Sequence, residues 1–596
     1  MKKCKLLLKS VEFSASMIYK SSRLWIVIYF LLSLALSTFG LASTYALKYL
    51  LDALTVENTV LQSIITWIVV YIAILLLSQG AKSVQDILYN TIFQKAAHLY
   101  DCRLSEKLSA LPLSVIDSSE GKDTVDDVRY AKNTAVYLTY RLVRLFSLAY
   151  TFGVAFAALM LFNVWFSLLL LLLTVPGMIL QLMYDKKTED LRRKQAPDVR
   201  KFCYYRWMLT DPWPAKDVRM YDLTEPIKSR YDEVKKEYLT ANKRLDKKKL
   251  RSMLFSEIIL RAGEILFTAF VIWKAVNAEI GIGDVALYVG LALSAVNAFE
   301  GFMNIGLMTY TRTTEVMSRV FDFFAIPTGG KSGTRILETF ESLVFRNVCF
   351  KYPHTQKDVL KGVSFTLNKG DKLSLVGING SGKSTIIKLM LGLYEIESGE
   401  ILINGYPMSD YDIRDVRKLF SVLFQSFVQY PLSLRDNIAL SDYDRAANDD
   451  AIISSLKQNG VYDELHEKLE NGLDSYMTRR FDDKGTELSK GQWQKIALSR
   501  AYFKNAKIFI FDEPSAALDA EAEDRIFNNF ESISEGKTGI MISHRISAAR
   551  MSNKILVLDG GIVTESGTHD ELIEKNGLYA RLYNLQKEKY TAKEEA

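Results

Sequence analysis

The sequence predicts a multi-domain protein in which an all-α polytopic membrane domain of six helices is followed by an α/β domain. The first observation is length, because 596 residues exceed the size of one domain. The second is a change in pattern near Pro327. Before it the chain contains long uncharged apolar runs, and after it short apolar strands alternate with charged turns that contain glycine.

Several stretches of the first part are long enough to cross a bilayer. A hydrocarbon core about 30 Å thick requires roughly 20 apolar helical residues. The stretches that meet this requirement are residues 24–47, 58–81, 255–276 and 285–308, together with the uncharged run 145–184. That run is about twice the spanning length, so it is predicted to form two helices that turn at Asn163. The total is six predicted spans.

The distribution of basic residues predicts the orientation of these spans. The segment 185–252 is rich in Lys and Arg, which favours the cytoplasmic side. Six spans then place the N-terminus and the C-terminal half on that side as well. Residues 1–23 are basic, and charges interrupt their apolar stretch, which favours an interfacial helix over a cleaved signal. The sequence therefore predicts a multi-pass protein of the cytoplasmic membrane.

Two groups of polar residues interrupt the last two spans. Glu257, Arg261 and Glu264 share one helical face, which favours a self-neutralising ladder of charges. Three further residues share a face of the sixth span: Asn297, Glu300 and Asn304. These three either line a cargo pathway or form hydrogen bonds between helices.

The overall charge and the cysteines exclude some classes of function. Lys and Arg total 75 against 69 acidic residues, so no basic patch predicts a nucleic-acid partner. The four cysteines lie far apart without a CxxC pair, which indicates free thiols rather than a zinc site.

The second part contains a phosphate-binding motif. The pattern G-x-x-x-x-G-K-[ST] runs from Gly377 to Ser384, after the strand-like "KLSLVG" and before the helical "TIIKLMLGL". Glycines let backbone N–H groups approach phosphates, and the helix N-terminus adds positive potential. Lys383 is expected to reach the β- and γ-phosphate oxygens, and the Ser384 hydroxyl to bind Mg²⁺.

A second apolar strand complements this loop. The segment "KIFIF", residues 507–511, ends in Asp512 and Glu513. Asp512 is placed to hold Mg²⁺, and Glu513 to orient or deprotonate an attacking water. The two motifs together predict an enzyme that hydrolyses a nucleoside triphosphate.

The stretch "ELSKGQWQKIALSRA", residues 487–501, identifies the family that the chain resembles. The signature Leu-Ser-Gly-Gly-Gln of the ATP-binding cassette (ABC) transporters appears here as Leu488-Ser489-Lys490-Gly491-Gln492. Lys490 replaces a glycine, whereas Ser489 and Gly491 are retained. The resemblance covers nearly the whole chain and implies an exporter-type half-transporter. The implied fold is six transmembrane helices fused to an α/β P-loop nucleotide-binding domain with a helical subdomain.

The expected organisation has five parts. They are an interfacial helix at 1–23, a transmembrane domain at 24–326 with two long cytoplasmic loops, a linker at 327–340, a cassette at 341–588 and a charged tail at 589–596. Segments near 113–124 and 207–217 resemble the coupling helices by which such exporters contact their cassettes.

The resemblance also implies roles for individual residues, with ATP and Mg²⁺ as cofactors. The implied catalytic residues are Glu513, His544 and Gln425. The implied metal ligands are Ser384, Gln425 and Asp512. The residues implied to contact ATP are Tyr352, which would stack on adenine, Gly377, Asn379, Gly380, Ser381, Gly382, Lys383, Ser384, Thr385, Ser489, Gly491, Gln492 and Asp519.

In this family the signature of one subunit closes over the ATP of another, so the resemblance implies a dimer, with a homodimer favoured. The expected function is ATP-driven export by alternating access. "GQWQKIALSRAYF" is similar to bacterial exporters of lantibiotic-type and other modified peptides, which favours peptide cargo in a bacterial membrane. The alternatives are a lipid or multidrug exporter and, from another class, an ATP-gated channel or a sensor.

Overall fold

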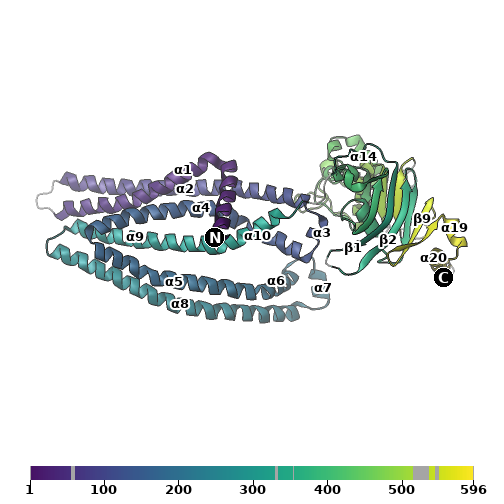
Figure 1. Ribbon diagram of the computed structural model, residues 1–596. Coiled ribbons are helices and arrows are strands. Elements are labelled where there is room, and N and C mark those ends of the chain that lie inside the picture. Colours follow the sequence, from purple (N-terminus) through teal and green to yellow (C-terminus); the bar gives the residue numbers. More distant parts are fainter. Residues whose placement is uncertain are drawn as a thin grey trace. The chain divides into compact units, whose positions relative to one another are not determined.

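The computed structural model describes residues 2–55, 61–328, 333–353, 355–513, 530, 536–543 and 549–594. The chain forms two compact units (Figure 1). The first consists of Met1–Ser109 and Asp123–Ile326, and the second of Ala110–Lys122 and Pro327–Ala596. The short segment Ala110–Lys122 therefore groups with the second unit, although it connects two helices of the first.

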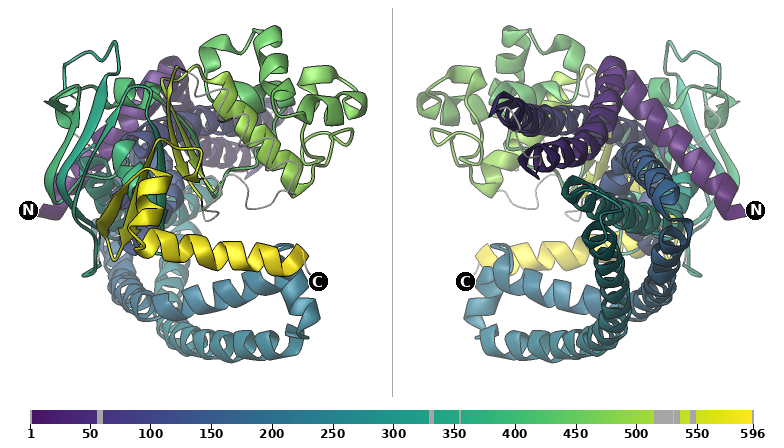
Figure 2. Two further views of the ribbon diagram at one scale, coloured as in Figure 1. Left: turned by 90° about the vertical axis from the view of Figure 1, so that its right-hand side faces the viewer. Right: turned by 90° about the vertical axis from the view of Figure 1, so that its left-hand side faces the viewer.

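Long helices build the first unit. They are α1 (Lys2–Thr55), α2 (Leu61–Ala110), α4 (Ser119–Phe162), α5 (Val164–Lys194), α8 (Thr224–Val276) and α9 (Ile282–Met308). Shorter elements are α6 (Ala196–Thr210), α7 (Ala215–Met220), a π-helical turn (Thr309–Thr313) and α10 (Thr314–Ala325). α9 packs against α1, α5 and α8. The right-hand view of Figure 2 looks along this bundle.

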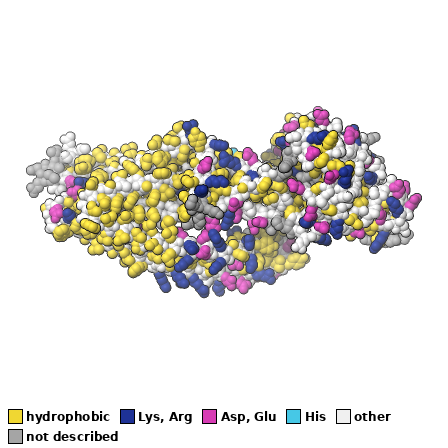
Figure 3. Space-filling model, viewed as in Figure 1, with side chains coloured by type: hydrophobic (Ala, Val, Ile, Leu, Met, Phe, Trp, Pro, Cys, Tyr) yellow, Lys and Arg dark blue, Asp and Glu magenta, His cyan; other side chains and the backbone are white. Residues whose placement is uncertain are grey.

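Five helices in the described part of the chain are long and apolar enough to cross a membrane, namely α1, α2, α4, α5 and α9. The remaining predicted span lies in α8, where Glu257, Arg261 and Glu264 reduce the apolar character. The predicted turn at Asn163 is confirmed, because Asn163 separates α4 from α5 and its Oδ1 accepts a hydrogen bond from Phe166 N at 3.1 Å. Figure 3 shows hydrophobic side chains over much of the visible face of this unit.

The charges of α8 neutralise one another along the helix. Arg261 Nη2 lies 2.7 Å from Glu257 Oε1, and Arg261 Nη1 lies 2.6 Å from Glu264 Oε2. These contacts confirm the predicted ladder, which lowers the cost of placing charges in an apolar span. Figure 3 also shows Lys and Arg side chains gathered along α8.

Two sheets form the framework of the second unit. An antiparallel sheet has the order β2-β1-β4-β5, and a larger sheet has the order β10-β9-β3-β8-β7-β6. In the larger sheet β10 is antiparallel to β9, and the described pairs from β9 to β6 are parallel. The strands are β1 (Ser342–Lys351), β2 (Asp358–Asn368), β3 (Lys372–Gly377), β4 (Ser398–Ile403), β5 (Tyr406–Pro407), β6 (Phe420–Leu423), β7 (Ile508–Asp512), β8 (Thr538–Ile542), β9 (Lys554–Asp559) and β10 (Ile562–Gly567).

A helical layer accompanies the sheets and confirms the predicted helical subdomain. Leu434, Ile452, Trp493 and Ile496 form part of its separate apolar core. The left-hand view of Figure 2 shows these helices to one side of the strands. The α-helices of this unit within the described residues are α3 (Leu113–Ile116), α11 (Lys383–Met390), α12 (Ile413–Lys418), α13 (Leu434–Ala439), α14 (Asp449–Lys457), α15 (Val461–Leu465), α16 (Lys490–Phe503), α19 (His569–Glu574) and α20 (Leu578–Glu594).

The described end of the predicted linker is attached to the second unit. Gly333 N donates to Tyr411 O at 3.1 Å. The Arg335 guanidinium lies 3.4 Å from the centroid of the Tyr406 ring, a cation–π contact. Phe340 is buried in the core between the sheets and α11. Residues 333–340 are therefore part of the folded cassette in this structure.

Candidate active site

The predicted nucleotide site lies at one edge of the six-stranded sheet. β3 ends at Gly377, β6 at Leu423 and β7 at Asp512, and β8 lies between β3 and β7. The carboxyl ends of parallel strands share an edge, where open α/β sheets bind their ligands. The motifs that follow these three strands are therefore brought together, although more than a hundred residues separate the first from the last.

Glycine shapes the loop between β3 and α11. Gly377, Gly380 and Gly382 have φ angles of 156°, 80° and 105°. A Cβ at Gly377 would lie 2.2 Å from Leu558 O, and a Cβ at Gly382 would lie 2.6 Å from Leu360 Cδ2 in a backbone conformation that side chains disfavour. Gly380 and its neighbour Asn379 are exposed. The loop is thus open to a ligand at the start of α11, where N–H groups favour an anion.

Lys383 is buried beneath this loop. Its Nζ donates to Gly377 O at 2.8 Å and to Ile378 O at 3.0 Å. Burial lowers the pKa of the Lys383 ammonium, and the nearby carboxylates of Glu513 and Asp512 oppose that shift. An ammonium group held by two carbonyl groups can exchange them for phosphate oxygens, which form stronger charge-assisted hydrogen bonds.

The predicted metal ligands Ser384 and Asp512 lie together. Ser384 Oγ donates to Asp512 Oδ1 at 3.4 Å, and Asp512 is buried at the end of β7. Hydroxyl and carboxylate oxygens are the hard ligands that Mg²⁺ prefers. In the same loop, Ser381 Oγ is buried and has no hydrogen-bond partner among the described residues. A phosphate group would provide the hydrogen-bond partner that this buried hydroxyl lacks.

Glu513 and Gln425 are in direct contact. Gln425 Nε2 donates to Glu513 Oε2 at 2.7 Å. Glu513 has a φ of 54°, a strained conformation for a residue other than glycine, and its N–H donates to Ile542 O at 2.9 Å. Such strain is common where a side chain is held for function. The carboxylate is therefore positioned at the sheet edge, beside an amide whose carbonyl oxygen can bind a metal.

Tyr352 follows β1 and is held from two directions. Its hydroxyl lies 3.1 Å from Thr385 Oγ1 and accepts from Lys388 Nζ at 3.3 Å. Its ring meets Phe350 and Tyr394 edge-on, with centroid distances of 5.0 and 5.3 Å. Tyr352 and Thr385 were predicted to contact ATP, whereas Lys388 and Tyr394 were missed because no motif contains them.

The signature residues begin a helix of the helical layer. Ser489 caps α16, because Gln492 N donates to Ser489 Oγ at 3.2 Å and Ser489 N donates to Gln492 Oε1 at 3.0 Å. This capping box satisfies donors at the helix start. Ser489 is exposed, Gly491 is half-buried, and Trp493 anchors the helix in the core. The signature therefore presents a fixed and accessible helix start.

Two predicted site residues, Asp519 and His544, lie outside the described residues. The roles implied for both residues stay predictions.

The predicted cargo residues lie on α9. Asn297 and Asn304 are exposed, and neither side chain has a hydrogen-bond partner within the described ranges. Glu300 is half-buried and lies within electrostatic range of the charge ladder on α8. Glu300 therefore interacts electrostatically with the ladder, whereas neither asparagine side chain forms a hydrogen bond to another helix within the described ranges.

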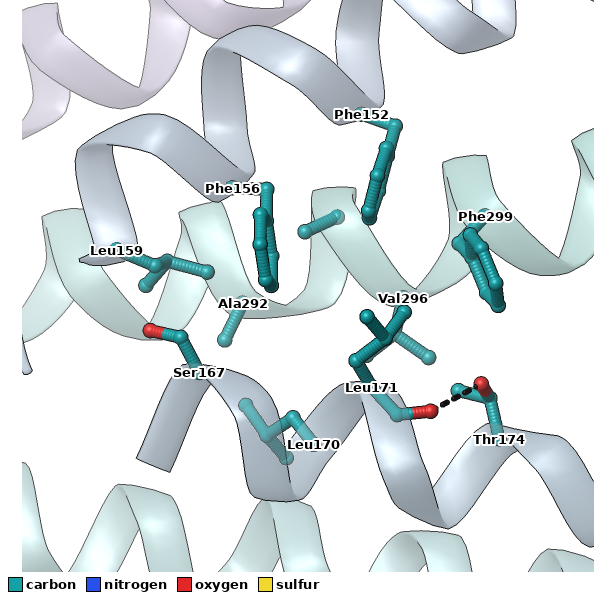
Figure 4. A pocket seen from close by; sticks show the side chains of 11 residues that line it. Phe152, Phe156, Leu159, Ser167, Leu170, Leu171, Thr174, Ala292, Val296 and Phe299 are labelled. Carbon is teal, nitrogen blue, oxygen red and sulfur yellow. Dashed lines mark hydrogen bonds between the residues drawn. The ribbon is translucent and has the colours of Figure 1, made fainter. Parts of the chain in front are cut away.

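A small apolar cavity lies elsewhere in the first unit (Figure 4). The space between its lining side chains is about 260 Å³ when the part open to solvent is included. Its lining comes from α4, α5 and α9 and consists of Phe152, Phe156, Leu159, Ser167, Leu170, Leu171, Thr174, Ala292, Ala295, Val296 and Phe299. Asn297, Glu300 and Asn304 are not part of this lining, so the two features of α9 are separate.

Comparison with known proteins places this site in a family. The profile described as "ABC transporter" matches residues 360–516. The subtilin transport ATP-binding protein SpaT of Bacillus subtilis is 30% identical over 91% of this chain and 88% of its own length. The nisin transport ATP-binding protein NisT of Lactococcus lactis subsp. lactis is 30% identical over 88% of each chain. The solved structure of a bacterial Atm1-family ABC exporter with ATP bound has a TM-score of 0.75 at 22% identity, covering 95% of this chain and 98% of that one.

Replacing Lys383 tests the phosphate loop. We expect Lys383→Ala to lower ATPase activity by at least about a hundredfold and to abolish transport, because a charge that contacts the phosphates is lost. The amount of protein in the membrane should not change, because no apolar helix is altered. Lys369→Ala is the matched control, since Lys369 is an exposed lysine of the same unit. Normal ATPase activity in Lys383→Ala would contradict the site.

Proposed function

Because this chain belongs to the ABC transporter family, we propose that it is a half-transporter that exports a peptide-type cargo across the cytoplasmic membrane. As a member of this family it binds and hydrolyses ATP. One observation carries the proposal. The same chain contains helices long and apolar enough to cross a membrane and a sheet edge where Lys383, Asp512 and Glu513 lie close together. We assign 24–326 to the membrane domain and 341–588 to the cassette, joined by 327–340, of which residues 333–340 pack on the cassette, and flanked by 1–23 and 589–596.

The break in α1 supports the first boundary. Ser22 has non-helical φ and ψ angles of −158° and 47°, so the helix changes direction at the end of the proposed interfacial segment 1–23. The basic N-terminus, the Lys-rich start of α8 and the cassette are then cytoplasmic. The bacterial sources of the two relatives support a bacterial cytoplasmic membrane.

In the proposed site, Ser384, Asp512 and the carbonyl oxygen of Gln425 hold Mg²⁺. When bound, that ion neutralises charge on the β- and γ-phosphates. Lys383 binds the same phosphates, and Tyr352 stacks on adenine. Glu513 orients the attacking water or accepts its proton, and its hydrogen bond to Gln425 holds the carboxylate in place. His544 and Asp519 complete the set that the family resemblance implies.

The site requires a second subunit, and we favour a homodimer. Ser489 and Gly491 start a helix in the helical layer, whereas Lys383 belongs to the sheet edge. We propose that the signature of one subunit covers the ATP of the other. The exposed side chains around α7, including Trp213, Met220 and Tyr221, support a contact with a partner. They fall in or beside the segment 207–217 that resembles a coupling helix.

ATP binding by such a dimer can drive alternating access. Shifting a two-state equilibrium from 1:99 to 99:1 requires about 5.5 kcal/mol of differential binding. Two ATP molecules held between the cassettes can supply this bias, and hydrolysis removes it. The membrane domain then returns to its starting state.

The charges of the first unit support a cationic peptide as cargo. Glu300 lies within electrostatic range of Glu257, Glu264 and Arg261. Three carboxylates against one guanidinium give this cluster an excess of negative charge. The relatives named for subtilin and nisin transport support peptide-type cargo. We propose that Asn297 and Asn304 line the same route.

A lipid or multidrug exporter is the second candidate, because the cavity in Figure 4 is lined mainly by apolar side chains. Cargo-stimulated ATPase with vesicle uptake of a cationic peptide would favour peptide export, and uptake of an apolar dye or lipid would favour the alternative. An ATP-gated channel or sensor would instead show current or signalling without stoichiometric hydrolysis.

The dimer can be tested with nanodiscs that hold one or two subunits. Discs with a single subunit should bind ATP, because one chain supplies both Lys383 and Tyr352. Their ATPase activity should be at least about a hundredfold lower than in two-subunit discs, because the signature contacts to the transition state are absent. Full turnover by verified single-subunit discs would contradict a site shared between subunits.

Glu300→Gln tests the cargo route. With a cationic peptide cargo, this change should reduce the stimulation of ATPase by about threefold or more, because a charge facing the cargo is lost. Basal hydrolysis and thermal stability should stay nearly constant, since the cassette is unaltered. Glu264→Gln is the comparison, because Glu264 binds Arg261 and its loss should lower stability. Unchanged stimulation with lower stability in Glu300→Gln would reject the cargo role.

A further inference from the structure

The segment Ala110–Lys122 contacts the aromatic residues beside the nucleotide site. Leu113, the first residue of α3, packs against the core of the second unit. Asp117 caps the end of α3, and its Oδ2 accepts a hydrogen bond from Tyr394 Oη. This segment is covalently continuous with α2 and α4 of the first unit. Neither Asp117 nor Tyr394 belongs to a motif used for the ATP site.

Tyr394 connects this hydrogen bond to Tyr352. The side chain is only 6% exposed, and its ring stands at 88° to the Tyr352 ring with the centroids 5.3 Å apart. Burial first, and then the hydrogen bond to Asp117, raise the pKa of the Tyr394 hydroxyl above its usual range. The hydroxyl therefore stays protonated and donates to Asp117 at neutral pH.

The Tyr352 ring is consequently fixed at both ends. Thr385 and Lys388 of α11 hold its hydroxyl, while the edge contact with Tyr394 limits the tilt of the ring. Stacking on a base depends on that tilt, because the two faces must be nearly parallel. Phosphate binding depends instead on the loop N–H groups and Lys383.

We propose that Tyr394 is a positioning residue for the adenine-stacking ring of Tyr352, and that Asp117 holds Tyr394 in place. The segment between α2 and α4 thereby sets the affinity of the cassette for the base of ATP. This inference rests on the ATP site proposed above. Because coupling between two sites is reciprocal, ATP binding must also favour the arrangement of the segment in which Asp117 accepts the hydrogen bond.

The test uses the full chain as a dimer in nanodiscs, with two probes measured side by side. The first is the KM for ATP, and the second is the inhibition constant of inorganic tripolyphosphate, which has phosphates but no base. Tyr394→Phe and Asp117→Ala should each raise the KM for ATP about three- to tenfold, the net effect of one typical hydrogen bond. The inhibition constant of tripolyphosphate should change less than about twofold, because Lys383 and the loop are intact.

Tyr411→Phe is the matched control. Tyr411 is a buried tyrosine of the same core, and its hydroxyl donates to Ile403 O at 3.0 Å. Its replacement removes a comparable hydrogen bond away from Tyr352, so it should lower thermal stability without changing the KM for ATP. The double variant Asp117→Ala/Tyr394→Phe should be no weaker in ATP binding than the worse single variant, because both remove one interaction.

Tyr352→Ala separates the two proposals. If it raises the KM for ATP while Tyr394→Phe does not, the role of Tyr394 is rejected and the ATP site stands. If Tyr352→Ala has no effect, the place of Tyr352 in the ATP site is wrong, and the role of Tyr394 is rejected with it. Equal weakening of ATP and tripolyphosphate by Tyr394→Phe, or a matching KM change in Tyr411→Phe, would show general loosening of the cassette and also overturn the inference.

Discussion

The burial of the Lys383 ammonium group is the constraint on which the cassette site depends. A charge that is only 6% exposed has lost most of its hydration and needs fixed oxygen atoms in return. The carbonyl groups of Gly377 and Ile378 provide them at 2.8 and 3.0 Å. They can do so because glycine lets the loop fold back over α11. The carboxylates of Asp512 and Glu513 add compensation from another strand, so the loop and the sheet order support the same charge.

The membrane unit also compensates a charge in an apolar environment, but it does so with side chains of the same helix. Arg261 cannot lose its proton, so its charge must be neutralised within an apolar span. Glu257 and Glu264 do this along a single helix, one turn to either side. Because two carboxylates meet one guanidinium, the ladder retains negative charge, and Glu300 on α9 adds to it. Local pairing therefore lowers the cost of placing this helix in a membrane while leaving the cluster with an excess of negative charge.

The segment Ala110–Lys122 connects two membrane-unit helices but groups with the cassette unit. It emerges from α2 and leads into α4, yet it packs with the cassette core through Leu113 and Asp117. The stretch is short and mixes apolar with polar side chains, and its Leu113 packs on the surface of the cassette core that receives it. That surface is the aromatic group formed by Tyr394, Tyr352 and Phe350, which lies next to the phosphate-binding helix.

Local pattern predicted much of the site, because each motif is contained in a few consecutive residues. The phosphate loop, the acidic pair after β7 and the signature could be read from the sequence without knowledge of their neighbours. The same holds for the ladder on α8, where residues three and four apart on a helix face one another, and for the turn at Asn163, which followed from an uncharged run of twice the spanning length. Lys388 and Tyr394 could not be found in this way, because their partners come from other elements of the fold.

By itself, the sequence determined the two-part organisation, the membrane-crossing helices, the phosphate-binding chemistry and the family. These features depend on composition, periodicity and spacing, which are properties of short segments. Only the tertiary structure decided that Gln425 contacts Glu513, that residues 333–340 join the cassette, and that Asp117 reaches Tyr394. Those contacts join residues 78 to 277 positions apart, so strand order and packing select them. No local pattern encodes such a choice, because it depends on which surfaces the whole chain buries together.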